Sequence, residues 1–299
     1  MNYIITGSSG FIGQNLIESL DSTKIMGIDM CPGKYTCAAI DISKDNLPIK
    51  GQGDTFIHLA ANTGVLPSIK SPQVDFEYNC RGILNCLEAC RKYGIKNFVF
   101  ASSGSVLGEI DPPSREDKKG SPMSPYGASK AAGEAYCAAY YHSYGINTVC
   151  LRFSNVYGPY SYNKNSFIAK FIKHVLFHNK EPFFIYGDGE QTRDFVHVKD
   201  LCEGIKLSAE SGLGGETFQL GSGKNTSINE VVDILKYYLK NKTGLECDVI
   251  NGEAQQGEIK YNYPDITKAR ELLKYDPKVD LDTGIKETID WFIKNIKRN

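Results

Sequence analysis

The sequence YIITGSSGFIG, residues 3–13, is the strongest indication of the fold. A short apolar run that favours β-structure is followed by a glycine-rich turn and by a helical pattern that reaches Leu20. A strand, a glycine loop and a helix in this order form a phosphate-binding arrangement, because the glycines permit a tight turn and close approach of the backbone. The N-terminus of the helix then faces the phosphate, and its amide dipoles favour negative charge.

The next apolar run, residues 25–28, ends at Asp29. A carboxylate at the end of the second strand accepts hydrogen bonds from the hydroxyls of an adenosine ribose and repels a 2′-phosphate. No Lys or Arg follows Asp29 until Lys34. The sequence therefore predicts NAD rather than NADP as the cofactor. The alternative, a glycine turn in some other α/β protein, is less favoured because Asp29 lies at the expected distance.

Further strand candidates alternate with helical patterns through the first half of the chain. We expect strands at residues 56–61, 97–102 and 148–153, with a long helix at 72–93 and another that begins after Ser124. Strands that alternate with helices, without hairpin signals between them, predict an α/β fold with a Rossmann-type doubly wound parallel sheet.

The regular alternation ends near residue 158. We expect a Rossmann domain over residues 1–158, to which the chain returns at about 195–222, and a smaller, discontinuous substrate-binding lobe of α/β type over 159–299. The expected helices of this part lie at residues 167–178, 200–208, 228–239 and 281–296, with one more starting at 265 and a late strand at 217–220.

Composition and charge argue against several classes of protein. The 34 basic and 35 acidic residues nearly cancel, which disfavours a nucleic-acid or anionic-membrane surface. No apolar run approaches the roughly 18 residues of a membrane span, and the start does not resemble a signal peptide. The nine cysteines are scattered without a C-x-x-C motif, which favours free thiols over disulfides or a metal site. We expect a cytoplasmic protein with no nucleic-acid, membrane or metal partner.

A candidate catalytic pair lies in the middle of the chain. Ser124 and Pro125 are a helix-start signal, so Tyr126 falls in the first turn and Lys130 lies above it on the same face. A neighbouring ammonium and the positive end of a helix dipole both favour phenolate, so the pair could supply a base near neutral pH. Tyr-x-x-x-Lys alone is common on helix surfaces. The glycine loop and the serines at 102–105, at the end of a strand, favour the catalytic interpretation.

With these motifs in this order, the chain resembles the extended short-chain dehydrogenase/reductases. The resemblance is specifically to the NAD-dependent nucleotide-sugar epimerase/dehydratase family, which includes the UDP-glucose 4-epimerases, and it runs essentially end to end. Besides the glycine loop, the blocks that carry it lie at residues 79–89, 102–103, 124–130, 152–159 and 187–195.

The resemblance implies roles for individual residues. Tyr126 would be the base, Lys130 would bind the nicotinamide ribose and lower the tyrosine pKa, and Ser103 would hydrogen-bond the reacting sugar hydroxyl. The implied cofactor-binding residues are Gly7, Gly10, Phe11, Ile12, Gly13, Asp29, Asp41, Ile42, Leu59, Ala60, Ala61, Asn79, Tyr126 and Lys130, with Asp41 and Ile42 at the adenine. The implied substrate-binding residues are Ser103, Ser105, Tyr126, Asn155 and Arg193, with the last two at the nucleotide diphosphate.

The resemblance also implies the reaction, in which NAD takes hydride from the sugar C4 and a transient 4-keto sugar forms. The 4,6-dehydratases of the family have Asp-Glu where this chain has Gly104 and Ser105. Neither residue acts as an acid or base, so dehydration is disfavoured, and Ser105 also argues against decarboxylation. We therefore expect an isomerase, an NAD-dependent 4-epimerase of nucleotide-diphosphate sugars. A net dehydrogenase or reductase, or an epimerase acting at another carbon, remains open. A non-catalytic dinucleotide sensor is disfavoured because both Tyr126 and Lys130 are present.

The chain departs from the family pattern at three places, of which Leu107 is a change in packing. Gln255 stands where the family usually has an arginine that contacts the diphosphate, so a charge-assisted bond worth roughly 1.5–3 kcal/mol is missing. Phosphate binding then depends on Arg193 alone, or the substrate is not an ordinary UDP-sugar. The loop at 62–68 lacks a lysine that some galactose epimerases use there, and Leu107 replaces the usual tyrosine. The resemblance further implies a role in carbohydrate metabolism and polysaccharide biosynthesis, and a homodimer formed through the helices at 72–93 and 125–144.

Overall fold

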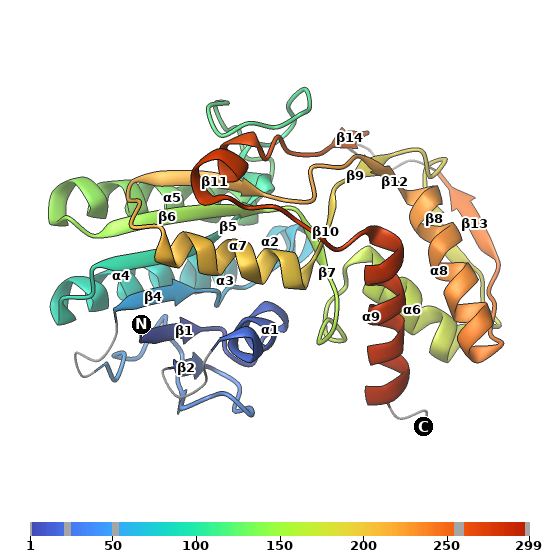
Figure 1. Ribbon diagram of the computed structural model, residues 1–299, viewed down its shortest axis with the longest axis horizontal. Coiled ribbons are helices and arrows are strands. Elements are labelled where there is room, and N and C mark those ends of the chain that lie inside the picture. Colours follow the sequence, from blue (N-terminus) through green and yellow to red (C-terminus); the bar gives the residue numbers. More distant parts are fainter. Residues whose placement is uncertain (1, 21–24, 50–53, 254–259, 297–299) are drawn as a thin grey trace.

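A seven-stranded parallel sheet is the centre of the computed structural model, which describes residues 2–20, 25–49, 54–253 and 260–296 (Figure 1). The strand order is β11-β6-β5-β4-β1-β2-β3, and every neighbouring pair is parallel. This arrangement confirms the predicted doubly wound α/β fold. The strands are β1 (Tyr3–Thr6), β2 (Ile25–Asp29), β3 (Ala38–Ala39), β4 (Thr55–His58), β5 (Asn97–Ser103), β6 (Asn147–Phe153) and β11 (Glu216–Leu220).

Helices cover both faces of this sheet, so its strands are apolar on both sides. On one face Ile5, Val99 and Leu151 pack against α1 and α7, and on the other Ile4 and Phe98 pack against α4 and α5. The helices of this part are α1 (Phe11–Ser19), α2 (Val65–Lys70), α3 (Pro72–Asp75), the π-helical η2 (Phe76–Arg81), α4 (Gly82–Tyr93), the 3-10 turn η3 (Gly104–Val106), α5 (Pro125–Tyr144) and α7 (Val198–Glu210).

The remaining helices and short strands form a lobe beside the sheet, with its own apolar core between α6, α8 and α9 (Figure 1). Its helices are α6 (Phe167–His178), α8 (Ile228–Thr243) and α9 (Leu281–Asn295). Its short strands, together with those that connect it to the sheet, are β7 (Asn155–Tyr157), β8 (Phe183–Tyr186), β9 (Thr192–Arg193), β10 (Phe195–His197), β12 (Thr226–Ser227), β13 (Val249–Gly252) and β14 (Tyr261–Asn262).

One return of the chain to the sheet was not predicted from the sequence. Ile266, Leu273 and Tyr275, which flank or belong to the short helix η4 (Ala269–Leu273), are buried in the same apolar core as Leu151. The Tyr275 hydroxyl donates to the backbone oxygen of Gly221, 2.9 Å away. Residues 266–275 therefore pack with the Rossmann sheet rather than with the lobe. The exact division into two domains stays a prediction.

All nine cysteines are free thiols, and seven of them are buried, as their surroundings in the sequence predicted. Among the described residues, no three His, Cys, Asp or Glu side chains gather in a way that could hold a metal ion. In the same part of the chain, no helix is long and apolar enough to cross a membrane.

Candidate active site

The glycine loop between β1 and α1 has the geometry of a phosphate cradle. Gly7 has a φ of +77°, a conformation that side chains rarely adopt, and a Cβ on Gly13 would lie 2.0 Å from the Gly7 oxygen. Gly10 is the N-cap of α1, and it has no side chain to accept from the first amides of the helix. The first amides of α1 are therefore left to a ligand, and the loop fits the diphosphate of a dinucleotide.

Asp29 ends β2 beside this loop. Its two carboxylate oxygens accept hydrogen bonds from the backbone N–H groups of Ser9 and Cys31, each at 2.9 Å. These bonds hold the carboxylate at the rim of a large cavity that Asp29 lines. This position suits recognition of ribose hydroxyls, as the sequence predicted. Asp41 does not line the cavity, because its carboxylate accepts bonds from Ser43 in its own turn.

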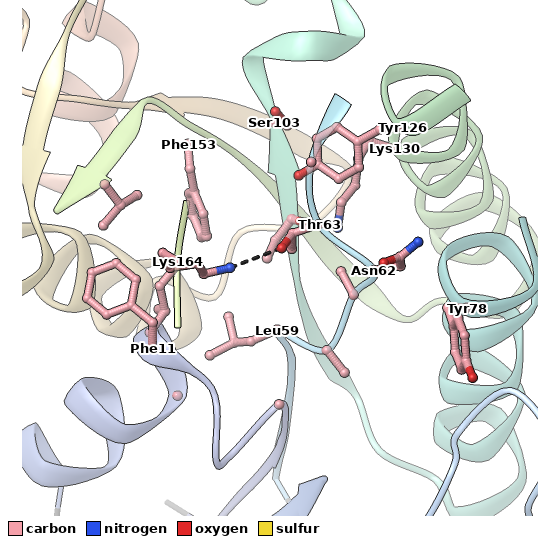
Figure 2. A pocket seen from close by; sticks show the side chains of 18 of the residues that line it. Phe11, Leu59, Asn62, Thr63, Tyr78, Ser103, Tyr126, Lys130, Phe153 and Lys164 are labelled. Atoms are coloured by element: carbon pink, nitrogen blue, oxygen red, sulfur yellow. Dashed lines mark hydrogen bonds between the residues drawn. The ribbon is translucent and has the colours of Figure 1, made fainter. Parts of the chain in front are cut away.

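The cavity has a volume of about 610 Å³ and lies at the carboxyl ends of β1, β2, β4 and β5 (Figure 2). In open α/β sheets this edge is where ligands bind. Most of the predicted cofactor-binding residues meet there, but Gly10, Asp41 and Asn79 do not line it. The predicted residues that line it are Gly7, Phe11, Ile12, Gly13, Asp29, Ile42, Leu59, Ala60, Ala61, Tyr126 and Lys130, joined by Ser103 and Asn155 of the predicted substrate set.

Tyr126 lies in the first turn of α5, at the inner end of the cavity (Figure 2). The Ser124 hydroxyl caps the helix by accepting from the backbone N–H of Gly127 at 3.1 Å, and Pro125 is its first residue, as predicted. Ser103, at the end of β5, lies near the Tyr126 hydroxyl and lowers its pKa. Ser103 in turn contacts Ser105, with 3.1 Å between the two hydroxyl oxygens.

The expected ionisation of Tyr126 is corrected by the structure. Burial raises the pKa of Tyr126 above its usual value, and the nearby Ser103, which lowers the pKa, does not reverse the shift. The Lys130 ammonium lies 5.8 Å from the centre of the Tyr126 ring and donates to the Ala101 carbonyl at 2.8 Å. The chain alone therefore favours a neutral phenol, because burial and the charge of Asp75 both act against phenolate.

Lys130 is buried in the same place, with 3% of its surface exposed. Burial lowers its pKa to about 8, whereas the nearby Asp75 acts in the opposite direction. The ammonium also lies over the Phe100 ring, 4.9 Å from its centre. Lys130 is thus a desolvated cation with one carbonyl acceptor, and it has hydrogen-bond donors left for a ligand.

A buried polar network near Tyr126 and Lys130 includes Asp75, which was not predicted as a site residue. The Asn79 amide donates to the Asp75 carboxylate at 2.9 Å and contacts the Ser129 hydroxyl at 3.2 Å. The Asn79 side chain also accepts from the backbone N–H of Asn62 at 2.8 Å and donates to the Asn62 carbonyl at 3.0 Å, and so holds the loop after β4. Asp75 precedes Asn79 by four residues within a helical pattern, and this spacing was the available signal.

A second cavity of about 460 Å³ adjoins the first one on the side of Ser103. Ser105 lines it, Asn155 lines both cavities, and the Asn155 amide donates to the Asp194 carbonyl at 3.0 Å. Arg193 lines neither cavity; its guanidinium donates to the backbone oxygen of Thr192 at 2.8 Å. The diphosphate-binding role of Arg193 therefore stays a prediction. Gln255 lies outside the described residues.

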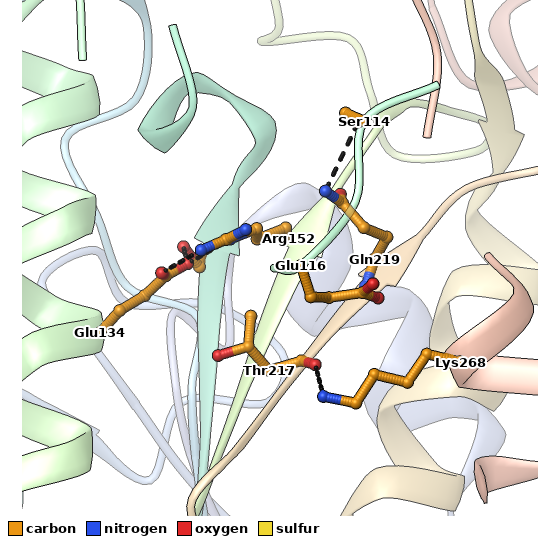
Figure 3. A network of polar contacts seen from close by, with 8 residues as sticks. Ser114, Glu116, Glu134, Arg152, Thr217, Gln219 and Lys268 are labelled. Carbon is orange, nitrogen blue, oxygen red and sulfur yellow. Dashed lines mark hydrogen bonds and ion pairs between the residues drawn. The ribbon is translucent and has the colours of Figure 1, made fainter. Parts of the chain in front are cut away.

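An ion pair fixes α5 to the sheet beneath these cavities (Figure 3). Arg152 of β6 and Glu134 of α5 form two hydrogen bonds, at 2.9 and 2.8 Å, and Ser102 donates to the same carboxylate at 2.6 Å. The Arg152 and Glu134 side chains are only 9% and 14% exposed. The pair and Ser102 tie the helix that carries Tyr126 to the strands β5 and β6, so the catalytic tyrosine candidate has a rigid support.

The loop 159–166 adds a cation to the first cavity. Lys164 lines the cavity and donates from its ammonium to the Thr63 hydroxyl at 3.0 Å (Figure 2). No sequence pattern indicated Lys164, because it lies in an irregular segment outside the motif blocks.

Comparison with known proteins assigns the chain to a family. Residues 3–221 match the model of the NAD dependent epimerase/dehydratase family. A UDP-glucuronate 4-epimerase of Thermodesulfobacterium geofontis is 33% identical over 99% of this chain and 97% of its own length.

Two solved structures are similar over nearly their whole length. One is a UDP-N-acetylglucosamine 4-epimerase of Methanobrevibacter ruminantium in complex with UDP-N-acetylmuramic acid, with 31% identity, a TM-score of 0.89 and 99% of both chains covered. The other is a UDP-glucuronic acid 4-epimerase of Bacillus cereus in complex with UDP-glucuronic acid and NAD, with 30% identity, a TM-score of 0.87 and 98% and 99% of the chains covered. With its glycine loop, Asp29 and the Tyr126–Lys130 pair at one sheet edge, this chain belongs to the NAD dependent epimerase/dehydratase family.

Proposed function

We propose that this protein is an NAD-dependent 4-epimerase of UDP-sugars. The first cavity takes the dinucleotide, and the adjoining cavity beyond Ser103 takes the nucleotide sugar. The UDP group is proposed because all three of the relatives described above are named for UDP-sugars. The sugar itself is a hexose whose C4 hydroxyl reaches Tyr126 and Ser103.

In the proposed reaction Tyr126 and Ser103 handle the proton of the sugar O4. As phenolate, the form that a bound oxidised nicotinamide would favour, Tyr126 accepts this proton while Ser103 holds the oxygen, and the electrons of the C4–H bond leave as hydride, which gives a 4-keto sugar. When bound, NAD supplies the hydride acceptor and later returns the hydride. After the keto sugar has rotated in the site, hydride adds to its opposite face and Tyr126 gives the proton back to O4. No net oxidation occurs, and only the configuration at C4 has changed.

The observation that carries this proposal is the composition of the wall beside Tyr126. The strand end and turn after Ala101 contribute Ser103, Gly104 and Ser105 to the second cavity. None of these three side chains is an acid or base at neutral pH. The lining of that cavity contains no Asp, Glu, His or Lys among the described residues. Elimination of water across C5 and C6 needs such a group, whereas epimerisation needs only Tyr126.

A panel of UDP-, GDP-, CDP- and dTDP-sugars, followed by NMR, tests the proposal. We expect inversion at C4 of a UDP-hexose, without added NAD if the cofactor stays bound and without accumulation of NADH. Stoichiometric NADH formation would instead identify a net dehydrogenase. A 4-keto-6-deoxy product would identify a dehydratase, and inversion at another carbon would overturn the C4 assignment.

We also propose that the protein is a cytoplasmic homodimer that serves polysaccharide biosynthesis. The nine free cysteines support a reducing compartment. Apolar side chains on the helices of the predicted interface support the dimer: Val74 and Phe76 are 45% and 55% exposed, and Tyr136 and Tyr144 of α5 are 39% and 51% exposed. Analytical ultracentrifugation tests the dimer, and a monomer at micromolar concentration would contradict it.

A further inference from the structure

Lys164 is a cation in the cofactor cavity to which no family motif assigns a role. It lies in the segment 159–166 that leads from β7 to α6, and its side chain reaches into the cavity between Phe11 and Thr63 (Figure 2). Its ammonium donates to the Thr63 hydroxyl at 3.0 Å. Among the described residues, no carboxylate forms an ion pair with Lys164, so a neutral hydroxyl is a weak partner for this charge.

The surroundings of Lys164 favour an anion as its partner. Burial lowers the pKa of the Lys164 ammonium, which shows that its charge is poorly solvated. Lys130 is the other basic residue in the described lining of the cavity, and its ammonium already donates to the Ala101 carbonyl. A ligand that enters this cavity with a negative charge therefore meets two ammonium groups, and Lys164 is the one that lies beside Phe11, at the start of the glycine-loop helix.

The segment that carries Lys164 is attached to the helix of the glycine loop. The Asn15 amide donates to the Pro159 carbonyl at 2.9 Å, and the Tyr160 hydroxyl donates to Glu18 at 2.6 Å. At the other end, Lys173 of α6 donates to the Lys164 carbonyl at 2.9 Å. These bonds hold the backbone of the segment in place, so a change of partner requires movement of the lysine side chain only.

The position of Lys164 distinguishes the cofactor from the sugar as the source of the anion. Lys164 and Thr63 line the cavity that contains the glycine loop, and neither lines the adjoining cavity of Ser105. The glycine loop offers backbone amides and a helix dipole to a diphosphate, which together equal about half a positive charge. No side chain of the loop is basic. The loop alone therefore leaves most of the two negative charges of a diphosphate uncompensated.

We propose that the Lys164 ammonium leaves Thr63 and pairs with the diphosphate of the bound dinucleotide, so that the segment 159–166 acts as a strap that retains the cofactor. The proposal rests on the use of NAD in the proposed function, but not on the identity of the sugar. Thr63 is then a resting partner of Lys164, which the diphosphate replaces.

Replacement of Lys164 by methionine tests this role through the affinity for the cofactor itself. We expect the dissociation constants of NAD and of ADP-ribose, which keeps the diphosphate but lacks nicotinamide, to rise together by about 10- to 100-fold in calorimetry. The fraction of protein purified with bound NAD should fall. Lys164→Arg keeps the charge and should bind NAD within a few-fold of the wild type, and Thr63→Val should bind at least as tightly as the wild type.

Lys170→Met is the matched control, because Lys170 lies on α6 near the strap but outside the cavity, and it should leave both constants unchanged. Unchanged binding of NAD and ADP-ribose to a folded Lys164→Met protein would overturn the proposal. So would a defect confined to substrates with a sugar carboxylate, since the anion would then belong to the sugar. The NAD and ADP-ribose titrations contain no UDP-sugar, so failure of the C4-epimerase proposal would leave their results unaffected.

Discussion

Replacement of Lys130 by methionine should stabilise the folded chain at neutral pH while it abolishes turnover. Burial lowers the pKa of Lys130 from its usual value to about 8. A lysine whose pKa is depressed in the folded state binds fewer protons there than in the unfolded chain, so its contribution to stability increases with pH. The loss of folding stability caused by burying the Lys130 charge is complete below about pH 8 and disappears by about pH 10.5. At about pH 7 it amounts to roughly 3 kcal/mol.

Part of this gain in stability is offset by the loss of a hydrogen bond, and the cost of that loss does not depend strongly on pH. Methionine cannot donate to the Ala101 carbonyl, which Lys130 contacts at 2.8 Å, and a buried carbonyl without a donor costs about 1–3 kcal/mol. The pH dependence therefore isolates the electrostatic effect. Relative to the wild type, the stability advantage of Lys130→Met should shrink by about 2 kcal/mol between about pH 7 and about pH 9.5.

Urea unfolding of the cofactor-free proteins at these two pH values, followed by circular dichroism, measures this difference. Lys236→Met is the control, because Lys236 is exposed on α8, and the difference between this variant and the wild type should not change with pH. The reasoning is refuted if Lys130→Met and Lys236→Met show the same pH dependence. A Lys130→Met protein that loses more stability at neutral than at alkaline pH would refute it as well.

Three further substitutions have defined outcomes. Tyr126→Phe should keep NAD binding in calorimetry and reduce turnover to the background, and near-wild-type activity would show that another group is the base. Gly13→Ala should abolish NAD binding in the same assay, because its Cβ would lie 2.0 Å from the Gly7 oxygen, so retained affinity would contradict the loop geometry. Glu134→Ala leaves the buried Arg152 guanidinium unpaired and should lower the free energy of unfolding in urea by about 3–5 kcal/mol, whereas Glu134→Gln should lose less.

Local patterns in the sequence were sufficient to predict most of the sheet and the start of the helix that carries Tyr126 and Lys130. The glycine loop and the Ser124–Pro125 cap each depend on a few adjacent residues, so β1, α1 and the start of α5 were found where they were expected. The pairing of β7 with β10, over a separation of about forty residues, was not predicted, because β7 has only three residues, too few to give a periodic signal.

The burial of residues 266–275 and of Tyr126 could not be predicted from local sequence patterns. Residues 266–275 pack with the sheet because they fill space beside α7 and β11, and no local pattern specifies that contact. The ionisation of Tyr126 was predicted incorrectly for the same reason, since the ammonium and the helix dipole are visible in the sequence whereas the loss of water is not. Lys164 and Asp75 became candidates only when the fold placed them near Tyr126 and Lys130.

The neutral phenol of Tyr126 suits a reversible reaction better than a permanent phenolate would. Proton removal from the sugar requires a base, and the positive charge of an oxidised nicotinamide beside Tyr126 would favour phenolate at that stage. Once hydride has left the sugar, that positive charge is gone, and burial again favours the neutral phenol. In the proposed mechanism Tyr126 would keep the proton while the keto sugar rotates and would release it when hydride returns. Its burial would thereby couple the movement of its proton to the movement of hydride, which epimerisation without net oxidation requires.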